Sequence, residues 1–274
     1  MKTILITGCS HSAGVELADR LIFDDYDTAI QKLRTLSLYE AHKLRLKNQI
    51  KYLLKNYDNK YFKSAFINDK IKTGDIASRY FRNIEKRKSW PSVLKNNLSD
   101  FHVENLAYGG NSFKLNVKNT FEYLRSNDQV SHCIYQVPTY TRTYIKHNGK
   151  AHNIIHIEDL ERLESIHDGD DAMLKDISKL KKRYKTLVKR DVTNGYFKKA
   201  IARFVDLVEK NADGIKTFYI LENDEIAHFF PKDKVIMDDF KSFRSKYQIG
   251  QSHVIDTRFA KDMADYVSNK IGVK

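Results

Sequence analysis

The side chains best able to do chemistry lie in turns that follow apolar segments of the sequence. The first turn, 8–12, reads Gly-Cys-Ser-His-Ser and comes directly after Ile4-Leu5-Ile6. Ser10 or Ser12 can act there as a nucleophile if a base lies nearby, and a backbone N–H can hold the oxyanion of an acyl-transfer intermediate. Either serine can equally be the N-cap of the helix that follows. By itself the turn leaves both roles open.

Two later turns have features that suit the same chemistry. Gly109-Gly110 follows a second strand-like segment, and paired glycines let a backbone N–H approach a reacting carbonyl without obstruction by Cβ. An ordinary strand-to-helix turn has the same composition. Ser252-His253 stands just before the last helical segment, where a doubly wound sheet would bring it back to the turn after the first strand.

The elements that must position these turns alternate between strands and helices along the chain. Apolar runs that end in turns predict strands near 4–6, 101–107, 131–137, 215–221 and 234–237, with helical spacing between them. This order predicts a flavodoxin-like three-layer α/β/α sandwich with a parallel sheet and functional loops at the carboxyl ends of its strands. We expect one domain over 1–274, with helical insertions at about 24–88 and 143–192 that form a cap.

Composition limits the class of protein and its compartment. The 274 residues are 41% hydrophobic and 30% charged, which excludes intrinsic disorder, and no window approaches the roughly 20 apolar residues of a membrane span. Cys9 and Cys133 both stand in apolar segments, which predicts buried, reduced thiols. The first residues lack the apolar region of a signal peptide. We therefore expect a soluble, cytoplasmic protein.

Nucleotide-binding motifs fit the first turn poorly. A phosphate loop requires lysine after its last glycine, and Val15 stands there instead. The turn partly resembles that of short-chain dehydrogenases, but Ser12 occupies the position of a middle glycine. The Tyr-x-x-x-Lys pair of those enzymes occurs here only at 39–43 and 266–270, far from the middle of the chain. We expect no cofactor.

Three blocks of sequence together resemble the SGNH (GDSL-type) hydrolases, particularly the divergent bacteriophage-type members. The turn around Ser10 resembles the nucleophile block, with Cys9 where Asp is usual. Segments 89–98 and 105–110 resemble the second block, and His253 with the start of the last helix resembles the final block. A viral origin would make the compartment the host cytoplasm.

The resemblance implies a role for each matched residue. Ser10 would be the nucleophile, His253 the general base, and the Ser10 and Gly110 amides the donors of the oxyanion hole. The bond cleaved would be a carboxylic ester, such as an O-acetyl group on a glycan or a small molecule. Asn111 and Arg142 would contact the substrate, Arg142 matching an arginine that follows the third block in phage-type members.

The sequence also departs from the family pattern. The third block should supply an Asn to the oxyanion hole, but Pro138 stands there, so Gln136 or Thr139 would substitute. Loss of one such donor costs about 3 kcal/mol of transition-state stabilisation. The Asp expected three residues before His253 is Gly250, which leaves Gln251 or a backbone carbonyl to orient the imidazole. Weak activity is one consequence of these changes.

Charge and histidine clusters leave further functions open. The net charge of +13, with a basic run at 179–185, suits a non-catalytic scaffold that binds nucleic acid or another polyanion, although a solvated helix face has the same composition. An acyltransferase would use the same covalent chemistry. The histidines at 147, 152 and 156 suggest loop residues rather than a metal site, and we expect no metal. Tyr135, Tyr140 and Tyr144 line the cleft or fill the core, and the oligomeric state is left open.

Overall fold

The computed structural model describes most of the chain. The described residues are 1–9, 12, 19–36, 38–56, 70–140, 142–147, 150–154, 157, 160–161, 164, 169, 171–247 and 257–273.

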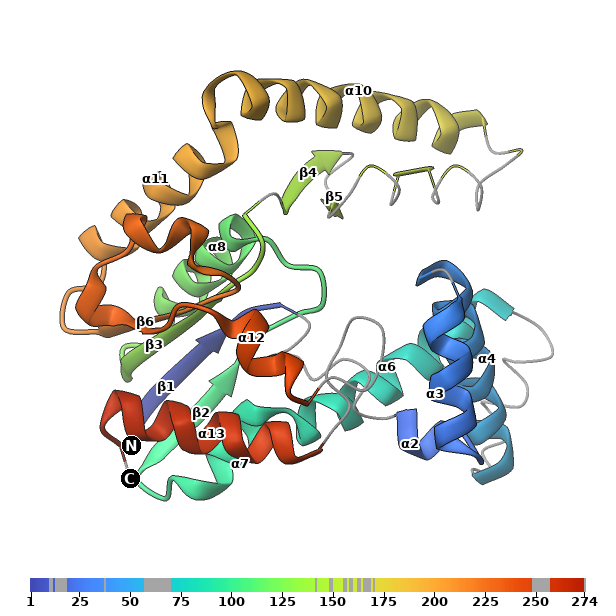
Figure 1. The fold of residues 1–274 in the computed structure, drawn as a ribbon, viewed down its shortest axis with the longest axis horizontal. Coiled ribbons are helices and arrows are strands. Elements are labelled where there is room, and N and C mark those ends of the chain that lie inside the picture. Colours follow the sequence, from blue (N-terminus) through green and yellow to red (C-terminus); the bar gives the residue numbers. More distant parts are fainter. Residues whose placement is uncertain are drawn as a thin grey trace.

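A five-stranded, all-parallel sheet forms the centre of the molecule (Figure 1). Its strand order is β2-β1-β3-β6-β7, the flavodoxin-like order, so the predicted fold class is confirmed. In the register of the sheet, Ile4 of β1 pairs with Val103 of β2 on one side and with His132 of β3 on the other. The strands are β1 (Lys2–Thr7), β2 (Phe101–Asn105), β3 (Val130–Val137), β6 (Lys216–Leu221) and β7 (Val235–Met237).

Helices cover both faces of this sheet, and the alternation of side chains along β1 shows why. Ile4 and Ile6 pack into the core beneath α7 and α13, whereas Leu5 packs into the core beneath α8 and α11. Because successive side chains of a strand point to opposite faces, a wholly apolar strand needs a helical layer on each side. The four helices are α7 (Trp90–Asn97), α13 (Thr257–Ile271), α8 (Phe113–Leu124) and α11 (Tyr196–Lys210).

The first predicted insertion is helical and has apolar clusters of its own. Leu53 and Phe81 join α4 to α6, and Ile30 and Leu33 of α3 form a second small cluster. Between residues 26 and 56 the insertion forms two helices, α3 and α4. In Figure 1 these helices lie to one side of the sheet, and α6 leads back to α7. The helices are α2 (Asp19–Ile22), α3 (Tyr26–Thr35), α4 (Leu38–Asn56) and α6 (Lys70–Lys88).

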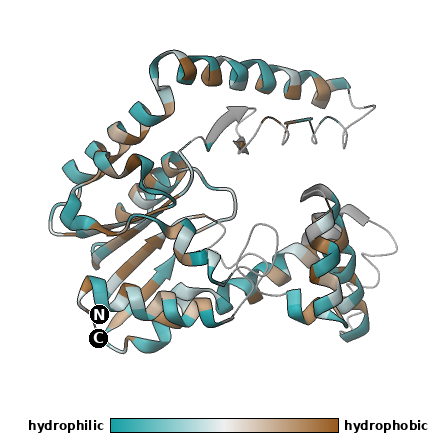
Figure 2. Ribbon diagram, viewed as in Figure 1, coloured by the Kyte–Doolittle hydropathy of each residue, from teal (hydrophilic) through white to brown (hydrophobic). Residues whose placement is uncertain are grey.

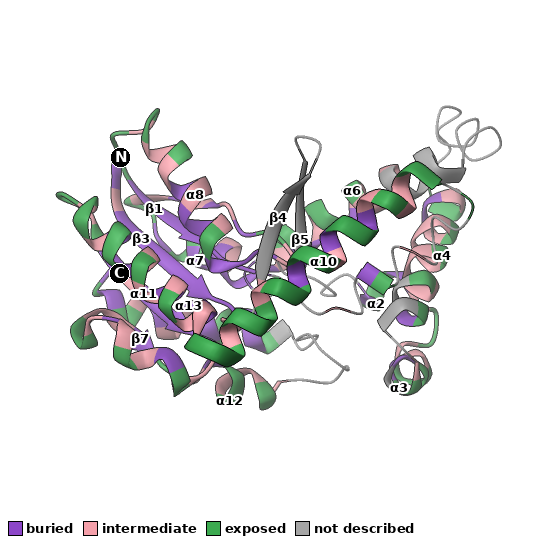
Figure 3. Ribbon diagram, turned by 90° about the horizontal axis from the view of Figure 1, so that it is seen from above, coloured by how far each residue is buried: buried purple, intermediate pink, exposed green. Residues whose placement is uncertain are grey.

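The second predicted insertion is not purely helical, which corrects the sequence-based expectation. Strands β4 (Thr143–His147) and β5 (Lys150–Ile154) form an antiparallel hairpin before the long helix α10 (Asp171–Asn194). The sequence Asn148-Gly149 between them is typical of a two-residue hairpin connection. Along α10, Ile177, Leu180 and Tyr184 are buried, while the opposite side is exposed (Figure 3).

Charged residues interrupt the apolar surface of the long helices, as the mixed colours of Figure 2 show. Within the described ranges, no helix is long and apolar enough to cross a membrane.

Short elements between β6 and α13 were absent from the sequence-based assignment. They are the 3₁₀ helices Asp224–Phe229 and Lys232–Lys234, and α12 (Phe240–Ser245).

Both cysteines are free and buried, which confirms the predicted thiols. Cys133 lies in the middle of β3, and burial raises the pKa of its thiol to about 12. A thiol with that pKa is almost entirely protonated at neutral pH, so it is a poor nucleophile. Cys133 therefore belongs to the core and not to the chemistry.

Candidate functional site

The predicted catalytic pair lies outside the described residues. Ser10 and His253 are both in this category, together with Gly250, Gln251 and Asp256. The structure describes instead the residues on either side of Ser10 and the loops after β2 and β3. The candidate site is built from these three neighbouring strand ends.

Ser12 is fully buried and is held by polar side chains from two other strands. Its backbone N–H and its hydroxyl both donate to the Gln136 side-chain oxygen Oε1, at 3.1 and 2.5 Å. Its backbone carbonyl accepts from Asn105 Nδ2 at 2.9 Å. The Ser12 hydroxyl is therefore engaged inside the protein and is not free to act as a nucleophile in this conformation.

Gly8 makes this close approach between β1 and β3 sterically possible. A Cβ at residue 8 would lie 2.9 Å from Gln136 Cβ, from Gln136 Oε1 and from Ser12 Oγ, closer than van der Waals contact allows. The Gly8 carbonyl also accepts from the backbone N–H of Tyr108 at 3.3 Å, in the loop after β2. The residues before and after Ser10 are thus fixed to the ends of both neighbouring strands.

Gly110 occupies the second turn in a backbone conformation that favours glycine. Its φ of 83° lies in the left-handed region, where a Cβ would clash with the backbone. Before it, Asn105 Oδ1 accepts from the backbone N–H of Ala107 at 2.9 Å and shapes the end of β2. Ser112 then caps α8, since its hydroxyl accepts from the backbone N–H of Leu115. The positive φ explains why glycine stands at this position, and the amide-donor role of Gly110 stays a prediction.

Asn111, predicted to contact substrate, has its side chain inside the protein. It is 1% exposed, and its Nδ2 donates to Asn116 Oδ1 at 3.0 Å. Asn116 in turn donates to the backbone carbonyl of Gln136 at 3.4 Å. These two asparagines therefore connect the second turn to β3, and no sequence motif pointed to Asn116.

The end of β3 carries polar groups without partners. Gln136 is 1% exposed, and its Nε2 is buried with no hydrogen-bond acceptor. The Nε and Nη1 atoms of Arg142 are also buried without acceptors, as is Thr7 Oγ1 at the neighbouring end of β1. Thr139 is half-buried, and its backbone carbonyl accepts from the Arg142 N–H at 3.1 Å. Unpaired donors thus gather at the edge that the sequence assigned to function.

The tyrosines suggested for the cleft have different surroundings. Tyr135 is buried in the core, where its ring stacks on Tyr219 with centroids 5.7 Å apart. Tyr140 is half-buried and donates its hydroxyl to Glu225, which also pairs with Lys198. The side chain of Tyr144 lies outside the described residues. Of the three, Tyr140 is the described ring that lies near the edge of the sheet without being part of its core.

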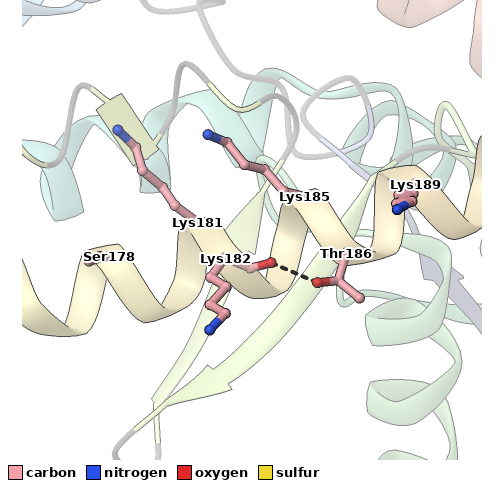
Figure 4. Close-up of a pocket in the computed structure, with 6 residues that line it drawn as sticks. All are labelled: Ser178, Lys181, Lys182, Lys185, Thr186 and Lys189. Carbon is pink, nitrogen blue, oxygen red and sulfur yellow. Dashed lines mark hydrogen bonds between the residues drawn. The ribbon is translucent and has the colours of Figure 1, made fainter.

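A hollow of about 490 Å³ lies along the exposed side of α10 (Figure 4). Figure 4 shows Lys181 and Lys185 on one side of the helix and Lys182 on the other. Lys181 is paired with Glu164, whereas none of the other lysines here makes an ion pair with a described carboxylate. The lining residues are Ser178, Lys181, Lys182, Lys185, Thr186 and Lys189.

The three histidines that the sequence assigned to loops are only partly described, and for two of them the loop assignment is wrong because they lie in strands. His147 ends β4 and His152 lies in β5, while His156 is outside the described residues. In the part of the chain that the structure covers, no three histidine, cysteine or carboxylate side chains come together as metal ligands would.

Comparisons with known proteins add no assignment at this point, because neither the protein-family models nor the curated proteins contain a match to this chain. The function is therefore argued from the residues alone.

Proposed function

We propose that this protein is an SGNH-type serine hydrolase that cleaves a carboxylic ester through an acyl-enzyme on Ser10. The observation that carries the proposal is the buried hydrogen-bond network that fixes Ser12 to Gln136 and Asn105. A serine nucleophile must be held within a few tenths of an ångström of its reacting geometry. Anchoring its turn from two neighbouring strands supplies that precision.

The proposed reaction has two steps. His253 takes the proton of the Ser10 hydroxyl as Oγ attacks the ester carbonyl carbon, and the N–H groups of Ser10 and Gly110 hold the oxyanion. The ester C–O bond then breaks, and the proton on His253 passes to the departing alcohol. In the second step His253 activates water, which releases the carboxylic acid and restores Ser10. Transfer to another alcohol instead of water would make the protein an acyltransferase.

Gln136 would serve this reaction as a positioning residue. Its Oε1 holds both the N–H and the hydroxyl of Ser12, while its Nε2 is enclosed beneath the turn. An enclosed Nε2 does not meet a substrate oxygen in this conformation. We therefore propose that Gln136 acts through Ser12, and that Thr139 remains the candidate for a direct contact at this position.

Replacement of the nucleophile tests the proposal. In the Ser10→Ala protein, hydrolysis of p-nitrophenyl acetate should fall to the uncatalysed rate while the thermal midpoint stays unchanged. His253→Gln should lower kcat by at least about a thousandfold, because the serine then keeps its proton. Ser99→Ala is the matched control, since Ser99 is an exposed serine in the turn before β2. Equal turnover by wild type and Ser10→Ala would end the proposal.

The hollow on α10 favours a second candidate function, binding of a polyanion such as nucleic acid. Lys182, Lys185 and Lys189 stand three and four residues apart on α10, and none of them makes an ion pair with a described carboxylate. Binding of this kind weakens steeply as salt is added, because cations are released from the phosphates.

Charge removal distinguishes this candidate from a merely solvated helix face. The triple variant Lys182→Gln, Lys185→Gln, Lys189→Gln should bind a duplex oligonucleotide with a salt slope smaller by roughly 2 to 3. A control triple change at Lys47, Lys51 and Lys55, exposed lysines four residues apart on α4, should leave the slope unchanged. Equal slopes for the two triple variants would exclude α10 as the binding surface.

A further inference from the structure

Arg142 combines a permanent positive charge with donors that the protein does not satisfy. Its Nε and Nη1 are buried without a hydrogen-bond acceptor. A guanidinium stays protonated at any pH a protein experiences, so it cannot escape this cost by losing its charge. Leaving a charged donor buried and unpaired is among the more expensive arrangements in a folded protein. Such a group in a native structure calls for a partner.

No carboxylate among the residues that the structure describes provides that partner. The segment that carries Arg142 contacts one carboxylate, Glu225, through the hydroxyl of Tyr140. Glu225 is already engaged by the ammonium group of Lys198, which also lies 5.3 Å from the centre of the Tyr140 ring. The arginine is nevertheless only half-buried, so an anion from solvent can reach it.

The position of Arg142 connects it to the candidate site. It closes the turn after β3 through its backbone N–H, which donates to the Thr139 carbonyl at 3.1 Å. Three residues before Thr139, Gln136 holds Ser12, and Gln136 Nε2 is a second buried donor without a partner. Two side chains with unpaired donors therefore lie in β3 and in the loop that follows it, and one of them, Gln136, also holds Ser12.

The geometry points to an anion-binding subsite at Arg142, which takes a carboxylate or a phosphate group carried by the ester substrate. This inference rests on the proposed function in so far as it names the substrate class of that site. The anion would accept charge-assisted hydrogen bonds from the guanidinium and so neutralise it. The protein would then prefer an anionic ester over a neutral ester with the same acyl group.

Anion binding can be measured without any catalysis. The thermal midpoint is recorded at constant ionic strength with increasing sodium acetate or inorganic phosphate, for wild type, Arg142→Met and Arg125→Met. Arg125 is the matched control, an exposed arginine at the opposite end of α8 from the candidate site. One of the two anions should raise the thermal midpoint of wild type and of Arg125→Met. Arg142→Met should bind that anion at least about tenfold more weakly, so its midpoint should rise only at higher anion concentrations. Equal stabilisation of all three proteins would overturn the subsite.

The stability of the free protein separates a binding role from a structural one. Methionine has a comparable reach but no charge, so Arg142→Met should raise the thermal midpoint in anion-free buffer. A structural arginine would have the opposite effect, because its removal would leave its partners unpaired. A lower midpoint for Arg142→Met would therefore contradict the proposal, whether or not the protein is a hydrolase.

Three acetate esters then identify the substrate class. Methyl acetoxyacetate is neutral, acetoxyacetate carries a carboxylate, and 2-acetoxyethyl phosphate carries a phosphate, and all three release acetate. Wild type should prefer one anionic ester over the neutral ester by about tenfold or more in kcat/KM, and Arg142→Met should lose that preference. Equal losses on all three esters would overturn the subsite. If Ser10→Ala and wild type hydrolyse none of them, the hydrolase proposal fails, and the anion titration alone decides the subsite.

Discussion

Two polar networks of this molecule, one half-buried and one buried, differ in how completely their donors are satisfied. Near the amino ends of β6 and β7, Glu209 accepts from Thr217 Oγ1 at 3.0 Å, from the Tyr219 hydroxyl at 2.6 Å and from Lys234 Nζ. At the carboxyl ends of β1 and β3, by contrast, Thr7, Gln136 and Arg142 all keep buried donor atoms without an acceptor. The donors around Glu209 are therefore paired, whereas at the other end of the sheet three side chains keep unpaired donor atoms.

The difference separates a network that stabilises the fold from buried donor atoms that cost stability, and among the latter we propose a ligand for Arg142 alone. A satisfied network contributes to stability, whereas an unsatisfied donor lowers it and persists where function requires it. The pKa values agree with this division. Burial alone would raise the pKa of Glu209, but hydrogen bonds from Lys234, Tyr219 and Thr217 outweigh burial and lower it.

Removal of the central acceptor should be the most damaging change. Glu209→Ala leaves the Tyr219 hydroxyl, the Thr217 hydroxyl and the Lys234 ammonium group without an acceptor, and should lower the free energy of unfolding by about 3 kcal/mol. Urea titration measures this value. Glu225→Ala is the control, because Glu225 also has a lysine and a tyrosine as partners but is exposed, and its loss should matter much less. Similar losses for the two variants would remove the distinction between the networks.

A side chain at residue 8 should damage the candidate site more than the fold. Gly8→Ala forces Cβ into the 2.9 Å contacts with Gln136 and Ser12 and should cost about 2 kcal/mol of stability. It should also slow reaction of Ser10 with a fluorophosphonate, because the anchored turn must move. Gly214→Ala meets no atoms within 4 Å, so it carries only the backbone strain of its positive φ of 72°. Unchanged labelling in Gly8→Ala would show that this packing does not serve the nucleophile.

Replacement of Gln136 should affect reactivity more than stability. Gln136→Met removes the acceptor of Ser12 together with the unpaired Nε2, so the two stability effects oppose each other. Labelling of Ser10 should slow by about tenfold. Gln136→Glu retains an acceptor for Ser12 and should recover part of the rate. A Met variant that loses stability but reacts at the wild-type rate would assign Gln136 to the scaffold.

His132 should give the smallest effect, visible as a change of stability with pH. Burial, then the nearby Lys216 and Lys2, lowers the pKa of His132 below its ordinary value of 6.5. The unfolded chain therefore binds the proton more readily, so stability is full above about pH 6.5 and is lost as pH falls through the lower folded pKa. In His132→Phe, the thermal midpoint should fall less between about pH 7.5 and about pH 5 than in wild type. Parallel pH profiles would contradict this assignment.

Much of the sheet could be predicted because its strands are short apolar runs bounded by turn residues. The segments that became β1, β3 and β6 are apolar on both faces, which is typical of buried parallel strands. The hairpin β4-β5 was missed although Asn148-Gly149 marks its turn. Each strand of the hairpin has only five residues, so the alternation of its side chains is a weak indication of a strand, and the basic, histidine-containing composition does not favour one either.

The candidate site was predictable only in part. Gly8 and Gly110 could be singled out because a glycine after a strand often reflects a close approach or a positive φ. Asn105 and Asn116 could not, because their contacts with Ser12 and with the Gln136 carbonyl depend on the strand order of the folded sheet. The unpaired donors of Arg142 are likewise a property of the fold, since no sequence pattern shows which arginine lacks an acceptor.

Covalent labelling tests the central claim most directly. The protein is treated with a fluorophosphonate and digested, and the modified residue is identified by mass spectrometry. The proposal predicts stoichiometric modification of Ser10, lost in His253→Gln and retained in Ser99→Ala. An unmodified protein, or a label on a different serine with Ser10 free, would contradict it.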